Sequence, residues 1–277
     1  MDLTSPSVVL EIIKKFDLRL TKAYGQNFLV DKNILNKIIQ AADLKKDDVV
    51  LEIGPGIGTL SHAIAEKIKK LYLVEIDKKL IGILKQTLEE HSNIEIIQAD
   101  ALRFDFSKLK PKPNKLVSNL PYNVASPLLI KVLTEMPSLA QLTVMIQKEM
   151  AQRLMANPKT KEYSGLSLKI RFLCETEKLF DVSKNVFLPK PKINSTVITL
   201  NKKPPLKVDQ ILLFSLLEKA FLHRRKSLRN SLLNWGKFNE AEIDDALKQS
   251  RVKKNQRAEE LTLEQFTKIA NYLKNGS

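Results

Sequence analysis

The chain is organised around Leu51-Glu52-Ile53-Gly54-Pro55-Gly56-Ile57-Gly58-Thr59-Leu60-Ser61, which holds three of the protein's eight glycines. These glycines come directly after the apolar run Val49-Val50-Leu51 and directly before a helical pattern that begins near Thr59. A strand that ends in Gly-x-Gly-x-Gly lets the backbone turn with positive φ and leaves no side chain between the main chain and a bound ligand. The stretch therefore predicts the floor of a site for a nucleotide-like molecule.

The glycine spacing disfavours a nicotinamide site. The dinucleotide fingerprint has glycines at its first, third and sixth positions, and the sixth position here is Thr59. Taken alone, the loop also fits an ordinary glycine turn between a strand and a helix. Other residues must therefore identify the ligand.

Strand and helix patterns alternate around this stretch, which is typical of a parallel sheet covered on both faces. We predict strands over 48–53, 71–76, 94–99, 114–119 and 142–147, and helices over 59–68, 78–90 and 126–135. Two further strands, 175–182 and 194–200, are separated by prolines and predict an antiparallel edge. Beyond Lys202-Lys203-Pro204-Pro205, helical patterns cover 209–221, 226–235, 240–248 and 263–273. We expect Asp31 to cap a helix that runs to Ala42, and Thr262-x-x-Gln265 to form the capping box of the last helix. The predicted fold class is α/β, a Rossmann-like and mostly parallel sheet with a small all-α C-terminal domain.

Bulk composition points to a globular chain with an anionic partner. At 277 residues and 43% hydrophobic, the chain can bury a sizeable core. Its net charge is +15, which favours polyanions, and nucleic acid is the usual one. Three runs contain basic residues and no acid: 108–115, 182–207 and 223–229. Any one of them fits a solvated face, but together they favour a surface that binds nucleic acid.

Several classes are disfavoured. No apolar run approaches the roughly 18 residues of a membrane helix, and the N-terminus lacks a signal-peptide pattern, so we expect a cytoplasmic protein. Cys174 is the only cysteine and is expected in the core. The three histidines, His62, His91 and His223, lack metal-ligand spacing, so we expect no metal.

Polar residues follow three successive predicted strands. In open α/β sheets, ligands bind beyond the carboxyl ends of the strands. Glu75, 21 residues after Gly54, is placed to accept the hydroxyls of a ribose, and Asp100 to accept an adenine amino group. Each acid alone fits a helix cap, although Asp77 is the better cap of its helix. Together with Asn119, they predict an adenosine-shaped pocket.

Asn119-Leu120-Pro121-Tyr122 gives the sharpest chemical signal. An exocyclic adenine amine is a poor nucleophile, because its lone pair is delocalised into the ring. If the Asn119 side-chain oxygen and the Leu120 carbonyl both accept its N–H groups, the lone pair points outward. Pro121 has no N–H to compete, and Tyr122 offers a flat face for an extruded base. The alternative is a turn that closes a strand.

These motifs resemble the ribosomal RNA adenine N6,N6-dimethyltransferases, the bacterial small-subunit enzyme in particular. The resemblance spans nearly the whole chain and is highly specific because its motifs occur jointly and in order. They are Gly25-Gln26-Asn27-Phe28-Leu29, the glycine stretch 51–60, Asn119-Leu120-Pro121-Tyr122-Asn123-Val124, Phe187-Leu188-Pro189-Lys190-Pro191-Lys192-Ile193, Arg224-Arg225-Lys226-Ser227-Leu228-Arg229-Asn230 and Arg257-Ala258-Glu259-Glu260-Leu261.

The resemblance implies an S-adenosylmethionine-dependent enzyme that dimethylates two adjacent adenosines in the 3′-terminal hairpin of small-subunit (16S) rRNA. It implies a catalytic domain over 1–203, whose segment 1–44 covers the cofactor, and an RNA-binding helical domain over 208–277. The expected partner is an immature small ribosomal subunit, bound by a monomer without metal or membrane.

The resemblance also implies roles for single residues. Asn119, Leu120 and Tyr122 are the expected catalytic residues. The expected cofactor-binding residues are Asn27 and Leu29 over the cofactor, Gly54 beside its methionine part, Glu75 at the ribose, Asp100 at the adenine, and Asn119. The expected substrate contacts are Tyr122, Phe187, which sandwiches the base against Tyr122, and Arg224, Arg225, Lys226 and Arg229. We expect Arg225 and Arg229 to lie one turn apart on one helix face.

Three alternatives stay open on the sequence. A large-subunit (23S) rRNA adenine methyltransferase of the resistance type shares every pocket motif. A non-catalytic ribosome assembly factor is a different class, and a DNA adenine methyltransferase fits least, because its signature differs from Leu-Pro-Tyr. The chain also departs from the family at 250–255, where it has Ser250-Arg251-Val252-Lys253-Lys254-Asn255 and relatives usually have a glycine and a proline.

Overall fold

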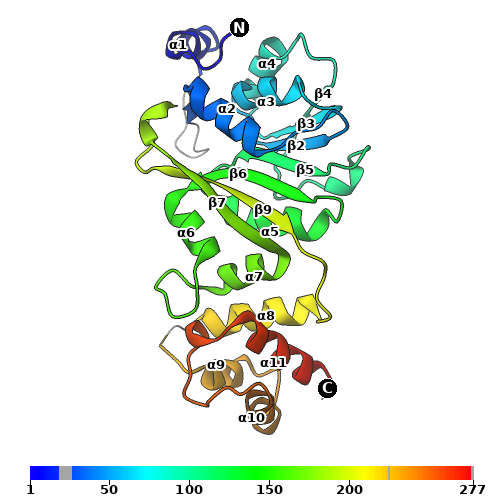
Figure 1. The fold of residues 1–277 in the computed structure, drawn as a ribbon, viewed down its shortest axis with the longest axis vertical. Helices are drawn as coiled ribbons and strands as arrows, with labels where there is room; N and C mark the ends of the chain where they lie inside the picture. The colour runs from blue at the N-terminus through cyan, green and yellow to red at the C-terminus, as the bar shows by residue number, and fades with distance from the viewer. Residues whose placement is uncertain (19–26, 224, 276–277) are drawn as a thin grey trace. The chain divides into compact units, whose positions relative to one another are not determined.

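A computed structural model describes residues 1–18, 27–223 and 225–275 (Figure 1). By its internal contacts the chain divides into two compact units, which we call the sheet unit and the helical unit. The sheet unit comprises Met1–Ala151 and Thr176–Lys202, and the helical unit comprises Gln152–Glu175 and Lys203–Ser277.

The sheet unit is built on a sheet that has seven strands in the described part of the chain, in the order β4-β3-β2-β5-β6-β9-β7 (Figure 1). β2, β3, β4, β5 and β6 pair in parallel, and β9 pairs antiparallel with β6. Both the parallel sheet and its antiparallel edge are therefore confirmed. The strands are β2 (Val49–Ile53), β3 (Lys70–Glu75), β4 (Ile94–Gln98), β5 (Lys115–Asn119), β6 (Gln141–Gln147), β7 (Cys174–Val182) and β9 (Ser195–Lys202).

Apolar helix faces contribute to two core clusters, one of which includes strands of this sheet. Every residue of β2 is buried, as expected of a strand covered on both faces. One cluster joins α2 (Lys32–Ala41) and α3 (Thr59–Ala65) to the central strands. The other joins α1 (Pro6–Lys15) to α4 (Lys78–Thr87). The remaining helices of this region are α5 (Ala125–Glu135) and α6 (Lys148–Met155), with a short 3-10 turn, η2 (Phe106–Lys108).

Local signals fix where these helices begin. Asp31 caps α2 by accepting the Ile34 N–H at 2.9 Å, and Asp77 caps α4 by accepting the Lys79 N–H at 2.9 Å. Gly58 precedes α3 with a φ of 94°, a conformation that favours glycine. The expected cap at Asp77 is confirmed, and α4 follows β3 without using Glu75 as its cap.

A small two-stranded sheet was not predicted. β1 (Phe28–Leu29) pairs antiparallel with β8 (Phe187–Leu188), which follows the turn η3 (Lys184–Val186). Each strand has two residues, too few for an alternating pattern to be read. The pairing joins the segment before α2 to the loop before β9, so it depends on contacts between residues far apart in sequence.

The described residues of the helical unit form the four predicted C-terminal helices and also α7 (Gly165–Leu173). The four are α8 (Gln210–Phe221), α9 (Leu228–Trp235), α10 (Glu240–Gln249) and α11 (Leu263–Asn275), with a turn, η4 (Ala258–Glu260). The predicted capping box of α11 is present, because the Thr262 N–H donates to Gln265 Oε1 at 3.0 Å and the Gln265 N–H to Thr262 Oγ1 at 3.3 Å. No helix of the described residues has the length and apolarity that a membrane crossing needs.

The added helix moves the boundary between the two units. α7 (Gly165–Leu173) packs against α8 and α11, and the Tyr163 hydroxyl donates to the Leu261 carbonyl at 2.9 Å. Residues 152–175 therefore group with the helical unit, whereas the sequence placed them in a domain over 1–203. The functions expected of the two domains stay predictions.

Candidate active site

A cavity of about 310 Å³ lies in the sheet unit, at the carboxyl ends of β2, β3 and β5. Eight predicted site residues line it, drawn from segments between positions 27 and 122. They are Asn27, Leu29, Gly54, Glu75, Asp100, Asn119, Leu120 and Tyr122. The structure thus brings together every predicted cofactor-binding residue and every predicted catalytic residue, although their individual roles stay predictions.

The glycine loop and the Asn-Leu-Pro-Tyr motif pack directly against each other. Gly54 has a φ of 69°, and a Cβ atom built on it would lie 3.0 Å from Pro121 Cγ. A Cβ on Gly56, where φ is 62°, would lie 3.2 Å from the ring of Phe28. At both positions a side chain would be strained by the positive φ and crowded by a neighbouring ring. The loop can therefore approach a ligand with its backbone, as the sequence predicted.

Asn119, at the end of β5, carries an unpaired acceptor. Among the described residues, its buried Oδ1 atom has no hydrogen-bond partner. A buried polar atom left unpaired costs about 1–3 kcal/mol, so such atoms often indicate a ligand. The Leu120 N–H donates to the Met145 carbonyl at 3.1 Å, which fixes the backbone beside it. An N–H donor placed in this cavity would satisfy Asn119 Oδ1.

Tyr122 is anchored through its hydroxyl. The hydroxyl lies 2.8 Å from Ser195 Oγ, at the start of β9, and Ser195 is fully buried. Burial raises the pKa of Tyr122, so the phenol stays neutral. Because the hydroxyl is held at the sheet, the Tyr122 ring has a fixed position in the cavity wall.

The two predicted acids sit at adjacent strand ends. Glu75, at the end of β3, is 5% exposed, and its Oε1 accepts the N–H groups of Ile76 and Asp77 at 2.8 and 2.9 Å. Burial raises the pKa of this carboxyl. Asp100, just beyond β4, accepts the Leu102 N–H at 2.9 Å through Oδ1. These backbone bonds orient each carboxyl group at the cavity.

Glu52 is a cavity residue that we did not predict. It lies inside the fully buried strand β2, and its Oε2 accepts the Ser61 hydroxyl at 2.6 Å. Burial raises the pKa of its carboxyl to about 8, although the Ser61 hydrogen bond opposes that shift. A single acid within an apolar strand was the available sequence signal.

We expect the buried Glu52 carboxyl to make stability fall as pH rises. The unfolded chain releases this proton near pH 4.5 but the folded chain only near pH 8, so stability is lost between these values. Glu52→Gln should match the wild type near pH 4.5 and be more stable above pH 8 by roughly 3–5 kcal/mol. Urea unfolding at several pH values measures this difference. Glu89→Gln, which removes an exposed carboxyl, is the control. A stability difference between Glu52→Gln and the wild type that does not change with pH would refute the raised pKa of Glu52.

Phe187 is not brought to the cavity. It is 3% exposed, belongs to the core cluster and pairs with Leu29 across the β1–β8 sheet. Its neighbours in the core hold it there, because an aromatic side chain gains free energy from burial. This placement gives the expected sandwich with Tyr122 no support, and that role stays an untested prediction.

The prediction that Arg225 and Arg229 lie one turn apart on one helix face is wrong. α9 begins only at Leu228, because Ser227 caps it by accepting the Asn230 N–H, so Arg225 lies in the preceding turn. Arg225 and Lys226 are both exposed. Arg224 lies outside the described residues.

Arg229 is engaged within the helical unit. Its Nε donates to Asp244 Oδ1 at 2.6 Å, and its Nη2 pairs with Glu240. Hydrogen bonds from Arg229, and next from Lys254, lower the pKa of Asp244 to about 2. The Arg229 charge is therefore largely compensated inside the unit.

The fold and the cavity together define the class of protein. A sheet in this strand order, with its cavity at the carboxyl ends of the parallel strands, is the Rossmann-like fold of methyltransferases. Residues 3–275 match the family described as ribosomal RNA adenine dimethylase, and the chain belongs to this family. Family and fold together imply a methyl donor.

Individual relatives agree with this assignment. The ribosomal RNA small subunit methyltransferase A of Alkaliphilus metalliredigens is 41% identical over 276 residues, which cover 96% of each chain. A dimethyladenosine transferase from Plasmodium falciparum is similar in structure, with a TM-score of 0.78, 28% identity, and 90% of this chain and 98% of that chain covered. The 23S rRNA methyltransferase ErmE has a TM-score of 0.67, 28% identity, and coverages of 90% and 100%.

Proposed function

We propose that the protein transfers methyl groups from S-adenosylmethionine to N6 of two adjacent adenosines in the 3′-terminal hairpin of 16S rRNA. The product is N6,N6-dimethyladenosine. Curated relatives named for the small ribosomal subunit support this target over the 23S alternative. The observation that carries the proposal is the buried and unpaired Asn119 Oδ1 in a cavity floored by the glycine loop.

The described residues fit S-adenosylmethionine. Gly54 and Gly56 line the cavity with backbone and no side chain, and the buried Glu75 carboxyl supplies acceptors suited to ribose hydroxyls. Asp100 would accept from the adenine amino group, and Asn27 and Leu29 would cover the cofactor. When bound, this cofactor supplies an electrophilic methyl group on a sulfonium.

Positioning is the protein's main contribution to the reaction. Asn119 Oδ1 and the Leu120 carbonyl would accept the two N–H groups of the target amine, so that its lone pair points away from both. Tyr122, held by Ser195, would stack on the extruded base. Orientation of this kind can supply roughly 7–11 kcal/mol of a barrier. The proton lost after methylation is acidic enough to pass to water, so no strong base is required.

The RNA would bind through exposed cations, including Arg225 and Lys226 of the helical unit. The partner in this proposal is an immature small ribosomal subunit in the cytoplasm, bound by a monomer. Phosphate contacts of this kind release counterions, so affinity should fall as salt rises.

Arg225 and Arg229 should respond differently to substitution. Arg225→Ala is expected to make the negative slope of log K against log salt shallower by about one, because one phosphate contact is lost. Arg229→Ala should leave that slope unchanged and lower the thermal stability, because Asp244 and Glu240 lose their shared cation. RNA binding at several salt concentrations and thermal unfolding of both variants separate the effects. An equal loss of slope in both variants would place Arg229 on the RNA.

Methylation of purified subunits tests the proposed function. The protein is incubated with labelled S-adenosylmethionine and either unmodified small subunits or large subunits, and the nucleosides are then analysed. We expect dimethyladenosine only from small subunits, at two moles per mole. Label in the large subunit alone would support the 23S alternative, and no label in either would leave the assembly-factor alternative.

A further inference from the structure

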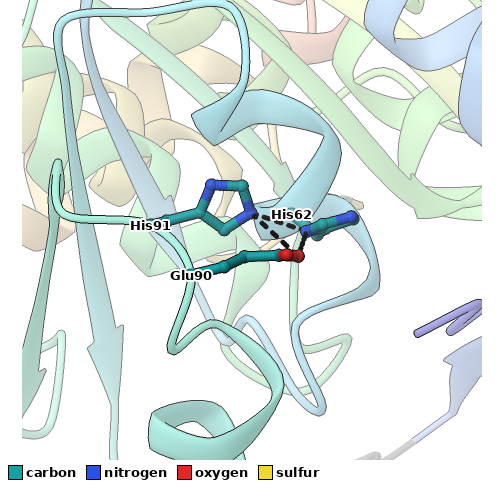
Figure 2. A group of neighbouring side chains, drawn as sticks. All are labelled: His62, Glu90 and His91. Atoms are coloured by element: carbon teal, nitrogen blue, oxygen red, sulfur yellow. Dashed lines mark hydrogen bonds and ion pairs between the residues drawn. The ribbon is translucent and has the colours of Figure 1, made fainter.

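Two histidines distant in sequence meet on the sheet unit (Figure 2). His62 lies in α3, and His91 follows α4 with Glu90 directly before it. His62 Nδ1 lies 2.6 Å from His91 Nε2, and Glu90 Oε1 lies 3.4 Å from the first nitrogen and 3.9 Å from the second. None of the three is among the described residues that line the cavity.

The surroundings give this cluster negative charge. His62 Nε2, the nitrogen turned away from His91, lies 3.8 Å from Glu66 Oε1, one helical turn along α3. In the described part of the chain, no Lys or Arg pairs with Glu66 or Glu90. Two carboxylates and two imidazoles thus share one site in a protein of charge +15.

A single proton does not satisfy this arrangement. If one ring donates to the other, the shared proton satisfies both nitrogens, and the Glu90 carboxylate beside them receives no proton from either of these two nitrogens. A cation placed among the three atoms would be attracted by all of them. Imidazole and carboxylate are also common ligands of zinc and related ions.

We infer that His62 Nδ1, His91 Nε2 and Glu90 bind a divalent transition-metal ion of the zinc type. Tetrahedral ligands on zinc stand about 3.3 Å apart, so the carboxylate spacings nearly fit and the two rings need to separate by less than about 1 Å. Glu66 Oε1 lies 3.8 Å from the far nitrogen of His62, on the side where a metal-bound imidazole usually meets a carboxylate. The ion would join α3 to the segment after α4. This inference is independent of the proposed function.

Metal titration of the full-length protein tests the inference. Chelator-treated protein is titrated with zinc chloride by calorimetry and with Co²⁺ by absorption spectroscopy at about pH 7.5. We expect one ion per chain and a Co²⁺ spectrum typical of tetrahedral ligands. His62→Ala and His91→Ala should each abolish stoichiometric binding, and Glu66→Gln should weaken binding by about 10-fold. His223→Ala, which alters the third and exposed histidine, is the matched control and should bind like the wild type.

Two results would overturn the inference. One is the lack of saturable 1:1 binding by the wild type, which would leave a hydrogen-bonded histidine pair. The other is unchanged affinity in a folded His62→Ala variant. If His91→Ala fails to fold by circular dichroism, Glu90→Gln replaces it, because the Glu90 side chain is 61% exposed. Undiminished zinc affinity in that variant would likewise refute the three-ligand site.

Discussion

Replacing Asn119 with Ala is expected to lower the rate of methyl transfer by about 10²–10³-fold, the cost of removing one precisely placed hydrogen-bonding group from an active site. The physical reason is that its buried Oδ1, unpaired among the described residues, would accept from the target amine. Affinity for RNA should change little, because Asn119 lies in the cavity rather than on an exposed basic surface. Single-turnover methylation of small subunits and RNA binding measure the two effects separately.

Asn119→Asp is the matched control for this prediction. It keeps an acceptor oxygen in the same place and removes the amide donor, so it should retain more activity than the Ala variant. Full activity in Asn119→Ala would refute the assigned role. The Asn119→Ala variant also tests a role in assembly. If small subunits mature in cells that carry this variant but not in cells that lack the protein, binding without methylation is enough for maturation.

Gly54→Ala is expected to reduce activity by about 10²-fold, because misplacing a reacting group by about 1 Å has an effect of that size. At φ 69° an L-residue is strained, and the new Cβ would lie 3.0 Å from Pro121 Cγ. Relief of that contact requires the glycine loop or the Asn-Leu-Pro-Tyr motif to move. We therefore expect both cofactor affinity and the rate of transfer to fall, which calorimetry with S-adenosylmethionine and methylation assays measure.

Gly82→Ala is the matched control. Gly82 is exposed in α4, and a Cβ built there meets no atom within 4 Å. This substitution should raise stability by roughly 0.5–1 kcal/mol and leave activity unchanged. Wild-type activity in Gly54→Ala would show that the two motifs are not coupled through this contact.

Features that depend on neighbours in sequence could be predicted. The caps at Asp31 and Asp77 and the box at Thr262 involve hydrogen bonds over two or three residues, and all were present as expected. The cavity lining was also predictable, because parallel strands carry the residues that follow them to one edge of the sheet. Glu52 was missed, although its sequence signal was present.

Features that depend on distant residues could not be read in this way. The expected helix face for Arg225 and Arg229 failed because Ser227 starts α9 late, and the Arg229 charge meets acids on α10. Phe187 packs in the core through a pairing with a segment about 160 residues earlier. His62 and His91 meet across 29 residues, so their spacing gave no sign of a shared site.

The amino-acid sequence alone specified the α/β class, the cavity at the strand ends and the family, because strand periodicity, glycine conformation and helix caps are local properties. The folded chain settled which side chains keep an unpaired atom, as Asn119 does, and which are neutralised, as Arg229 is. Burial and charge pairing arise from residues that meet only after folding, and no spacing along the chain encodes them.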